Sequence, residues 1–226
     1  MHRGYERGYE VVGKRILRTR EEWLCNRQKG IGGSEISAVV GRNPYMDNVT
    51  LWEIKTGRRK ADDISGKPYV KYGTQAEEHL RALFALDFPH YQVLYEENNS
   101  FANDRYPFAQ ASLDGWLVDE SGRIGVLEIK TTEILRAGQR EKWKDRMPMN
   151  YYCQVCFYMA VMEADFAVLK AQLKTDFGGD VRIETRHYHI ERSEVQEDID
   201  YLMQKGAEFW EYVKSDTRPP LILPEI

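Results

Sequence analysis

Two carboxylates and a lysine are spaced so that they can meet around one β-strand. Glu128 and Lys130 stand two residues apart in the β-rich run 124–131, so both side chains project from the same face of a strand. A buried charge without a partner is costly, and both charges therefore need one. Asp114 ends the preceding predicted strand in the sequence SLDG, where a turn can present its carboxylate to them.

Asp114 and Glu128 together offer hard oxygen ligands of the kind that Mg²⁺ and Mn²⁺ prefer. Lys130 beside them can position an attacking water, help to deprotonate it, or stabilise the charge of a phosphate. The alternative is structural, because E-x-K is a common pattern and also suits a hairpin with a surface salt bridge between Glu128 and Lys130.

Two further polar side chains are predicted to face apolar surroundings. In the predicted helix 69–86, Glu77 lies at the edge of the apolar stripe, whereas Glu78 falls on the polar side. The stripe consists of Gly73, Ala76, Leu80, Leu83 and Phe84. A carboxylate aimed at a core is unusual unless it is paired or binds a metal ion. Gln154 stands inside the most apolar helix of the chain, 148–162, where it is either a functional side chain or a core amide with satisfied hydrogen bonds.

A glycine-rich segment near the N-terminus has features of an anion site. Arg27 closes the predicted helix 20–28, and the run GIGGSEI, which contains Gly33 and Ser34, follows directly. Glycines let backbone amides approach a ligand, and the N-terminus of the helix that we expect Ser34 to cap favours an anion. Arg27 can add a bidentate fork for phosphate. The alternative is a glycine turn with a serine cap that is purely structural.

The elements that must position these residues follow one another as helices, strands, a helix, strands and a helix. This order predicts an α/β protein with one mixed central sheet flanked by helices. We expect a single domain over 1–226, with an N-terminal arm at 1–17 and a C-terminal tail at 215–226. The predicted helices are 20–28, a short one ending at Gly41, 49–56, 69–86, 148–162 and one that Ser193 caps and that ends near 214. The predicted strands are 91–95, 108–112, 116–118, 124–131, 166–173 and 181–190.

Composition narrows the class of protein. The 226 residues are 42% hydrophobic and 30% charged, as in an ordinary globular domain, and no run is long enough to span a membrane. The N-terminus lacks the apolar stretch of a signal peptide, and the three cysteines suit reduced thiols in a cytoplasmic protein. Cys153 and Cys156 lack a second pair for a zinc or iron–sulfur site, so we interpret them as helix packing residues. The net charge of −4 does not exclude nucleic acid, because metal ions neutralise the carboxylates that bind them.

Two other patterns stay open at this stage. The segment 136–146, which begins at Arg136, carries five basic and two acidic residues, a net charge of +3. It either follows a DNA backbone or forms a solvated loop, and Trp143 within it either stacks on a base or packs locally. His187 and His189 share one face of a strand, but no third metal ligand is evident near them, so a partly exposed sheet face is the preferred interpretation.

Five short motifs together resemble the phage lambda exonuclease family, also called YqaJ-like viral recombinases. They occur in family order and at family-like spacing, from Trp23 to Tyr158. Before the first site aspartate the family often has proline, and Leu113 stands there instead; this changes the stiffness of a turn rather than the chemistry. The matching stretches are Trp23 and Arg27 with GIGGSEI, then YGTQAEE, ASLDG, LEIKTT and YYCQVCFYM.

The resemblance implies a restriction-endonuclease-like fold with a PD-(D/E)xK site, two Mg²⁺ ions for which Mn²⁺ can substitute, and degradation of one strand of duplex DNA from a 5′-phosphorylated end. It also implies a homotrimer, a single-strand annealing partner and a phage or prophage origin. By this resemblance Asp114, Glu128, the carbonyl of Ile129 and Glu77 are metal ligands, and Lys130 orients the nucleophile. Gln154 contacts the reacting region, while Arg27, Gly33 and Ser34 form the 5′-phosphate pocket.

Other functions compete with this one. A structure-specific endonuclease has the same fold and metal chemistry but a different substrate. A non-catalytic DNA-binding module would have no need for both acids and Lys130. An iron–sulfur nuclease of the Cas4 type is disfavoured by the cysteine count.

Overall fold

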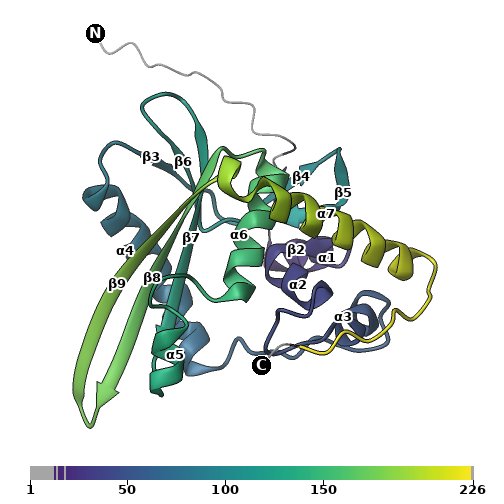
Figure 1. Ribbon diagram of the computed structural model, residues 1–226, viewed down its shortest axis with the longest axis horizontal. Helices are drawn as coiled ribbons and strands as arrows, with labels where there is room; N and C mark the ends of the chain where they lie inside the picture. Colours follow the sequence, from purple (N-terminus) through teal and green to yellow (C-terminus); the bar gives the residue numbers. More distant parts are fainter. Residues whose placement is uncertain (1–12, 14, 18, 225–226) are drawn as a thin grey trace.

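The computed structural model describes residues 13, 15–17 and 19–224, whose strands form two mixed sheets flanked by helices (Figure 1). The helices are α1 (Arg20–Arg27), α2 (Gly33–Val39), α3 (Asn48–Lys55), α4 (Pro68–Asp87), α5 (Ala137–Glu141), α6 (Met149–Met162) and α7 (Arg192–Lys214). The strands are β1 (Arg15–Ile16), β2 (Ile31–Gly32), β3 (Gln92–Leu94), β4 (Asn99–Asn103), β5 (Tyr106–Ala111), β6 (Gly115–Val118), β7 (Ile124–Glu133), β8 (Phe166–Phe177) and β9 (Asp180–Glu191).

A five-stranded sheet carries the residues of the acid–lysine motif. Its order is β3-β6-β7-β8-β9, with β7 and β8 parallel and the other neighbours antiparallel. Helix α4 covers one face, where Leu80 and Phe84 cluster with Leu127 and Ile129. Helix α6 lies on the other side of the sheet in Figure 1. The predicted α/β class with a mixed sheet between helices is therefore confirmed.

A second sheet corrects the expectation of one central sheet. Its order is β1-β4-β5-β2, with β2 and β5 parallel. Strands β1 and β2 are only two residues long, and β4 has the sequence NSFAN, which lacks the β-branched alternation of a strand. These strands form through pairing with neighbouring strands and not through a β-forming sequence of their own, so the sequence did not predict them. The short helix α5 was missed for a similar reason, since its five residues have no apolar stripe.

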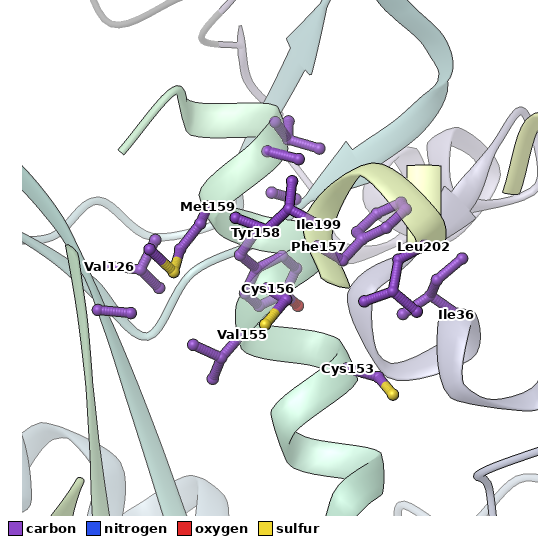
Figure 2. Close-up of a cluster of buried hydrophobic side chains, with 14 of the residues drawn as sticks. Ile36, Val126, Cys153, Val155, Cys156, Phe157, Tyr158, Met159, Ile199 and Leu202 are labelled. Carbon is purple, nitrogen blue, oxygen red and sulfur yellow. The ribbon is translucent and has the colours of Figure 1, made fainter. Parts of the chain in front are cut away.

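Helix α6 is the centre of the main core. Every residue from Cys153 to Met162 is buried, and the helix packs against α2, α7 and both sheets. Figure 2 shows its side chains meeting Val126 of β7, Ile36 of α2 and Leu202 of α7. Cys153 and its neighbour Cys156 lie in this cluster as free thiols, which confirms that they pack in a helix.

Described residues near both ends of the chain contact the rest of the fold. Strand β1, within the predicted N-terminal arm, pairs with β4, while 1–12, 14 and 18 lie outside the described residues. After α7 the chain returns to α3, where the Asn48 side chain donates to the Pro220 carbonyl at 2.8 Å and accepts from the Ile222 N–H at 2.9 Å. Of the helices described here, none combines the length and apolar character that a membrane crossing requires.

Three local expectations were wrong. Helix α2 is capped by Gly32, so Ser34 lies inside the helix and is not its cap. Helix α7 begins at Arg192 and is capped by Glu191, two residues before the predicted cap Ser193. Leu83, assigned to the apolar stripe of α4, is 45% exposed.

Candidate functional site

The candidate site lies where β6 and β7 separate. Pairing between these strands runs from Val118 opposite Ile124 to Gly115 opposite Leu127 and ends there, so the rest of β7 presents an edge that β6 does not cover. Asp114 stands directly before β6, and its Oδ2 accepts a hydrogen bond of 2.8 Å from the backbone N–H of Ile129. The sequence SLDG therefore places the Asp114 carboxylate against β7, as its spacing predicted.

Glu128 and Lys130 share one face of β7, also as predicted, and Gln154 of α6 meets them. The Glu128 side chain is 1% exposed, and its Oε1 lies 2.5 Å from Lys130 Nζ. The same Oε1 accepts a hydrogen bond of 2.7 Å from Gln154 Nε2, so this buried amide is tied directly to the acid. The other oxygen, Oε2, is buried and accepts no hydrogen bond from any described residue. A buried carboxylate oxygen without a donor is uncommon and needs a specific explanation.

Burial raises the pKa of each carboxylate of the site. Burial, and then the charge of Asp114, raise the pKa of Glu128 to about 8. Burial likewise raises the pKa of Asp114, although Lys130 and the Ile129 N–H oppose the shift. Lys130 is affected in the opposite sense: burial alone lowers its pKa, but Glu128 and Asp114 outweigh this and hold it above its usual value. The pKa values of these acids are raised although the charges of Lys130 and Arg81 oppose the shift, so the site holds less positive charge than its ionised carboxylates would need.

Glu77 approaches the same place from α4. Its side chain is 29% exposed and accepts a hydrogen bond of 3.1 Å from Arg81, which also donates to the Asp114 carbonyl at 2.5 Å. Burial and the charge of Asp114 raise the pKa of Glu77 to about 7. Glu78 is exposed, so the two neighbouring acids face in the predicted directions.

These residues fit a divalent cation. A cation would satisfy the unpartnered Oε2 of Glu128, and it would favour the ionised form of Asp114, whose pKa burial raises. The N–H and C=O of a strand residue point to the same edge, so the Ile129 carbonyl faces the uncovered side together with its N–H. Within the described part of the chain no three His, Cys, Asp or Glu side chains converge on one metal position. A cation held here by Asp114 and Glu128 would therefore need backbone or water oxygens, which Mg²⁺ readily accepts.

Arg27 and Ser34 lie together, as the glycine-rich motif predicted. Arg27 Nη2 is 3.3 Å from Ser34 Oγ, and the guanidinium lies over the Trp23 ring, 4.8 Å from its centroid. Arg27 Nη2 also contacts Glu35 at 3.4 Å, and Lys55 binds Glu35 from the other side at 2.8 Å. Sequence reasoning singled out neither Glu35 nor Lys55, because their pairing joins two segments that are distant in sequence.

A short chain of contacts joins the Arg27 region to the carboxylates. A Cβ on Gly33 would lie 2.2 Å from Cε1 of Tyr158, so only glycine allows α2 to approach α6 this closely. The Tyr158 hydroxyl accepts from Gln154 Nε2 at 3.2 Å, and the same amide nitrogen donates to Glu128. Gly33, Gln154 and Glu128 are thus brought together, and Tyr158, which the sequence did not single out, connects them.

The remaining candidates lie in local contacts. Trp143 is 3% exposed and packs against Tyr151 and Tyr188, so it fills the core and does not offer a face for stacking on a base. The His187 ring packs edge-on against Phe88, and His189 stacks on Phe166, in agreement with the sheet-face interpretation of the histidines.

A mixed sheet between helices, with two acids and a lysine where two strands separate, defines a chain of the restriction-endonuclease-like class. The chain belongs to the family of YqaJ-like viral recombinase domains, whose model matches residues 22–165. It is 29% identical over 202 residues to the Bacillus subtilis (strain 168) protein called "Uncharacterized protein YqaJ", covering 89% of this chain. The chain spans 58% of the length of that relative.

Solved structures show the same fold. The alkaline exonuclease LHK-Exo of Laribacter hongkongensis superposes with a TM-score of 0.62 at 18% identity, over 87% of this chain and 93% of the exonuclease. The same exonuclease in complex with dAMP gives 0.61 at 18% identity, over 86% and 95%. A phage-related exonuclease from Haemophilus somnus 129PT gives 0.51 at 14% identity, over 83% and 96%.

Proposed function

We propose that this chain is a Mg²⁺-dependent 5′-to-3′ exonuclease that degrades one strand of linear double-stranded DNA from a 5′-phosphorylated end. The observation that carries the proposal is the buried, unpartnered Oε2 of Glu128 beside Lys130 and Asp114. The family of viral recombinase domains and the structural similarity to proteins described as exonucleases support the same chemistry.

In this proposal Asp114, Glu128 and the Ile129 carbonyl hold the metal, with Glu77 at a second ion; Mn²⁺ can replace Mg²⁺. Bound metal supplies Lewis acidity and lowers the pKa of water at the phosphodiester. Lys130 orients the attacking water and stabilises phosphate charge. Gln154 holds Glu128 Oε1 in place, which leaves Oε2 free for the metal.

The end-recognition part of the proposal rests on Arg27, Ser34 and Gly33. A terminal 5′-phosphate carries more charge than an internal diester and has more free oxygens, so an arginine fork prefers it. Contacts from Gly33 to Tyr158, from Tyr158 to Gln154 and from Gln154 to Glu128 connect this region to the acids. The biological setting that we propose is phage-type recombination in a bacterial cytoplasm, with a ring-shaped homotrimer on DNA and a partner that anneals single strands.

The substrate test compares end-labelled linear duplex with closed circular duplex, in Mg²⁺ and in EDTA. We expect loss of one strand of the linear DNA in Mg²⁺ and no reaction on the circle. Cleavage of the circle would show an endonuclease. Binding without cleavage of either DNA would show a non-catalytic module.

The end-recognition test replaces Arg27 with alanine. A charge-assisted hydrogen bond is worth about 1.5–3 kcal/mol, so we expect a loss of roughly 10- to 150-fold on 5′-phosphorylated duplex. The loss should be largely absent on 5′-hydroxyl duplex. Equal losses on both substrates would show that Arg27 acts elsewhere.

A further inference from the structure

A buried lysine shares a carboxylate with the proposed phosphate-binding arginine. Lys55 Nζ, at the end of α3, lies 2.8 Å from Glu35 Oε2 and 3.0 Å from Oε1. It also donates to the Arg27 carbonyl at 2.8 Å. The Lys55 side chain is 1% exposed and that of Glu35 is 13% exposed. The pair therefore lies beneath Arg27, whose side chain is 30% exposed.

The Glu35 carboxylate lies closer to Lys55 than to Arg27. Lys55 contacts both carboxylate oxygens closely, and the Gly32 N–H donates to Oε2 at 2.7 Å. Arg27 reaches Oε1 only at 3.4 Å and through Nη2 alone. Two positive charges thus face one negative charge, and the more exposed cation is the more loosely held. The excess positive charge lies on Arg27, beside Ser34 and over the Trp23 ring.

We infer that Lys55 is a positioning residue that occupies Glu35 and so leaves Arg27 free to bind the terminal 5′-phosphate. This inference rests on the proposed function. When a phosphate binds, Arg27 can move away from Glu35. The largely buried Glu35 carboxylate still has partners, because Lys55 and the Gly32 N–H remain bound to it. Without Lys55, Arg27 is the one cation among the described residues that still contacts Glu35, and Glu35 then competes with the phosphate for the guanidinium.

The test measures KM and kcat on one duplex carrying either a 5′-phosphate or a 5′-hydroxyl. For Lys55→Met we expect KM on the phosphorylated duplex to rise about tenfold, the lower bound for a charge-assisted contact. We expect kcat, and both constants on the hydroxyl duplex, to stay unchanged. Binding of the two duplexes in EDTA, followed by fluorescence anisotropy, should show the same selective loss in Kd.

Rescue separates this role from simple support of the fold. Lys55→Met combined with Glu35→Gln removes both charges, so no carboxylate competes for Arg27, and we expect the phosphate preference to return. Lys170→Met is the matched control: Lys170 is also fully buried and ion-paired, to Asp87 at 3.5 Å, but it touches neither Arg27 nor Glu35. This control should leave the ratio of the two substrates unchanged.

The outcomes are distinct. If Lys55→Met loses as much activity on the hydroxyl duplex as on the phosphorylated duplex, or if the double variant does not recover the phosphate preference, the inference is wrong. The proposed function still stands in that case when wild type prefers the 5′-phosphate and Arg27→Ala abolishes that preference. If wild type uses both ends equally, 5′-phosphate recognition fails, and this inference fails with it.

Discussion

Replacing Glu128 with glutamine should make the metal-free protein more stable at neutral pH while abolishing its activity. Glutamine keeps the size of the side chain and an oxygen that accepts from Gln154, but it carries no charge beside Asp114. Burial and Asp114 raise the pKa of Glu128 from 4.5 to about 8. The folded protein therefore holds this carboxyl protonated over a range in which the unfolded chain has already ionised it.

The sign and size of the effect follow from this raised pKa. An acid whose pKa is higher in the folded state costs nothing below pH 4.5 and reduces stability progressively as pH rises towards 8. At about 1.4 kcal/mol per pH unit, the cost at pH 7 is on the order of 3 kcal/mol. Glutamine avoids this cost. For a chain of this size the melting temperature should be higher by about 6–12 °C.

The assay is thermal unfolding of wild type and Glu128→Gln in EDTA from pH 4.5 to pH 8. The difference between the two proteins cancels the titration of groups far from the site. We expect it to be small at pH 4.5 and to grow with pH. In Mg²⁺ the wild type should gain stability and the variant much less, because the metal supplies the missing charge. A variant less stable than wild type at pH 7 in EDTA would refute this view of Glu128.

Two further changes test the surroundings of the site. Glu77→Gln should slow cleavage at least tenfold, whereas Glu78→Gln, on the exposed side of α4, should leave single-turnover rates nearly unchanged; similar losses from both would remove the argument from helix facing. Gly33→Ala should lower the free energy of unfolding by about 1–3 kcal/mol, because its Cβ would lie 2.2 Å from the Tyr158 ring. The melting temperature and the cleavage rate should both fall as a result. Wild-type stability in this variant would show that α2 and α6 are not in close contact in solution.

Much of the site was predictable because it depends on local periodicity. Two-residue spacing places Glu128 and Lys130 on one face of β7, and helical spacing separates Glu77 from Glu78. These relations hold in any strand or helix, whatever packs against it. The long elements β7, β8, α4, α6 and α7 were found for the same reason.

Other features depend on contacts between segments far apart in the sequence. The Asn99 side chain donates to the Leu113 carbonyl at 2.9 Å and accepts from its N–H at 2.8 Å, which fixes the turn just before Asp114. Glu35 similarly forms an ion pair with Lys55, which lies twenty residues further along the chain on another helix. No spacing rule within a single element encodes such pairs, so only the folded arrangement shows them.

The most direct test of the account is single-turnover cleavage of 5′-phosphorylated linear duplex in Mg²⁺ by wild type and Asp114→Asn. Asparagine keeps an oxygen that can accept from the Ile129 N–H, so the turn should persist while the metal-binding charge is lost. We predict strand degradation by wild type and a loss of at least about a thousandfold in the variant, which has an unchanged fold but lacks one carboxylate for the metal. Near wild-type cleavage by Asp114→Asn would contradict the assignment of this carboxylate site.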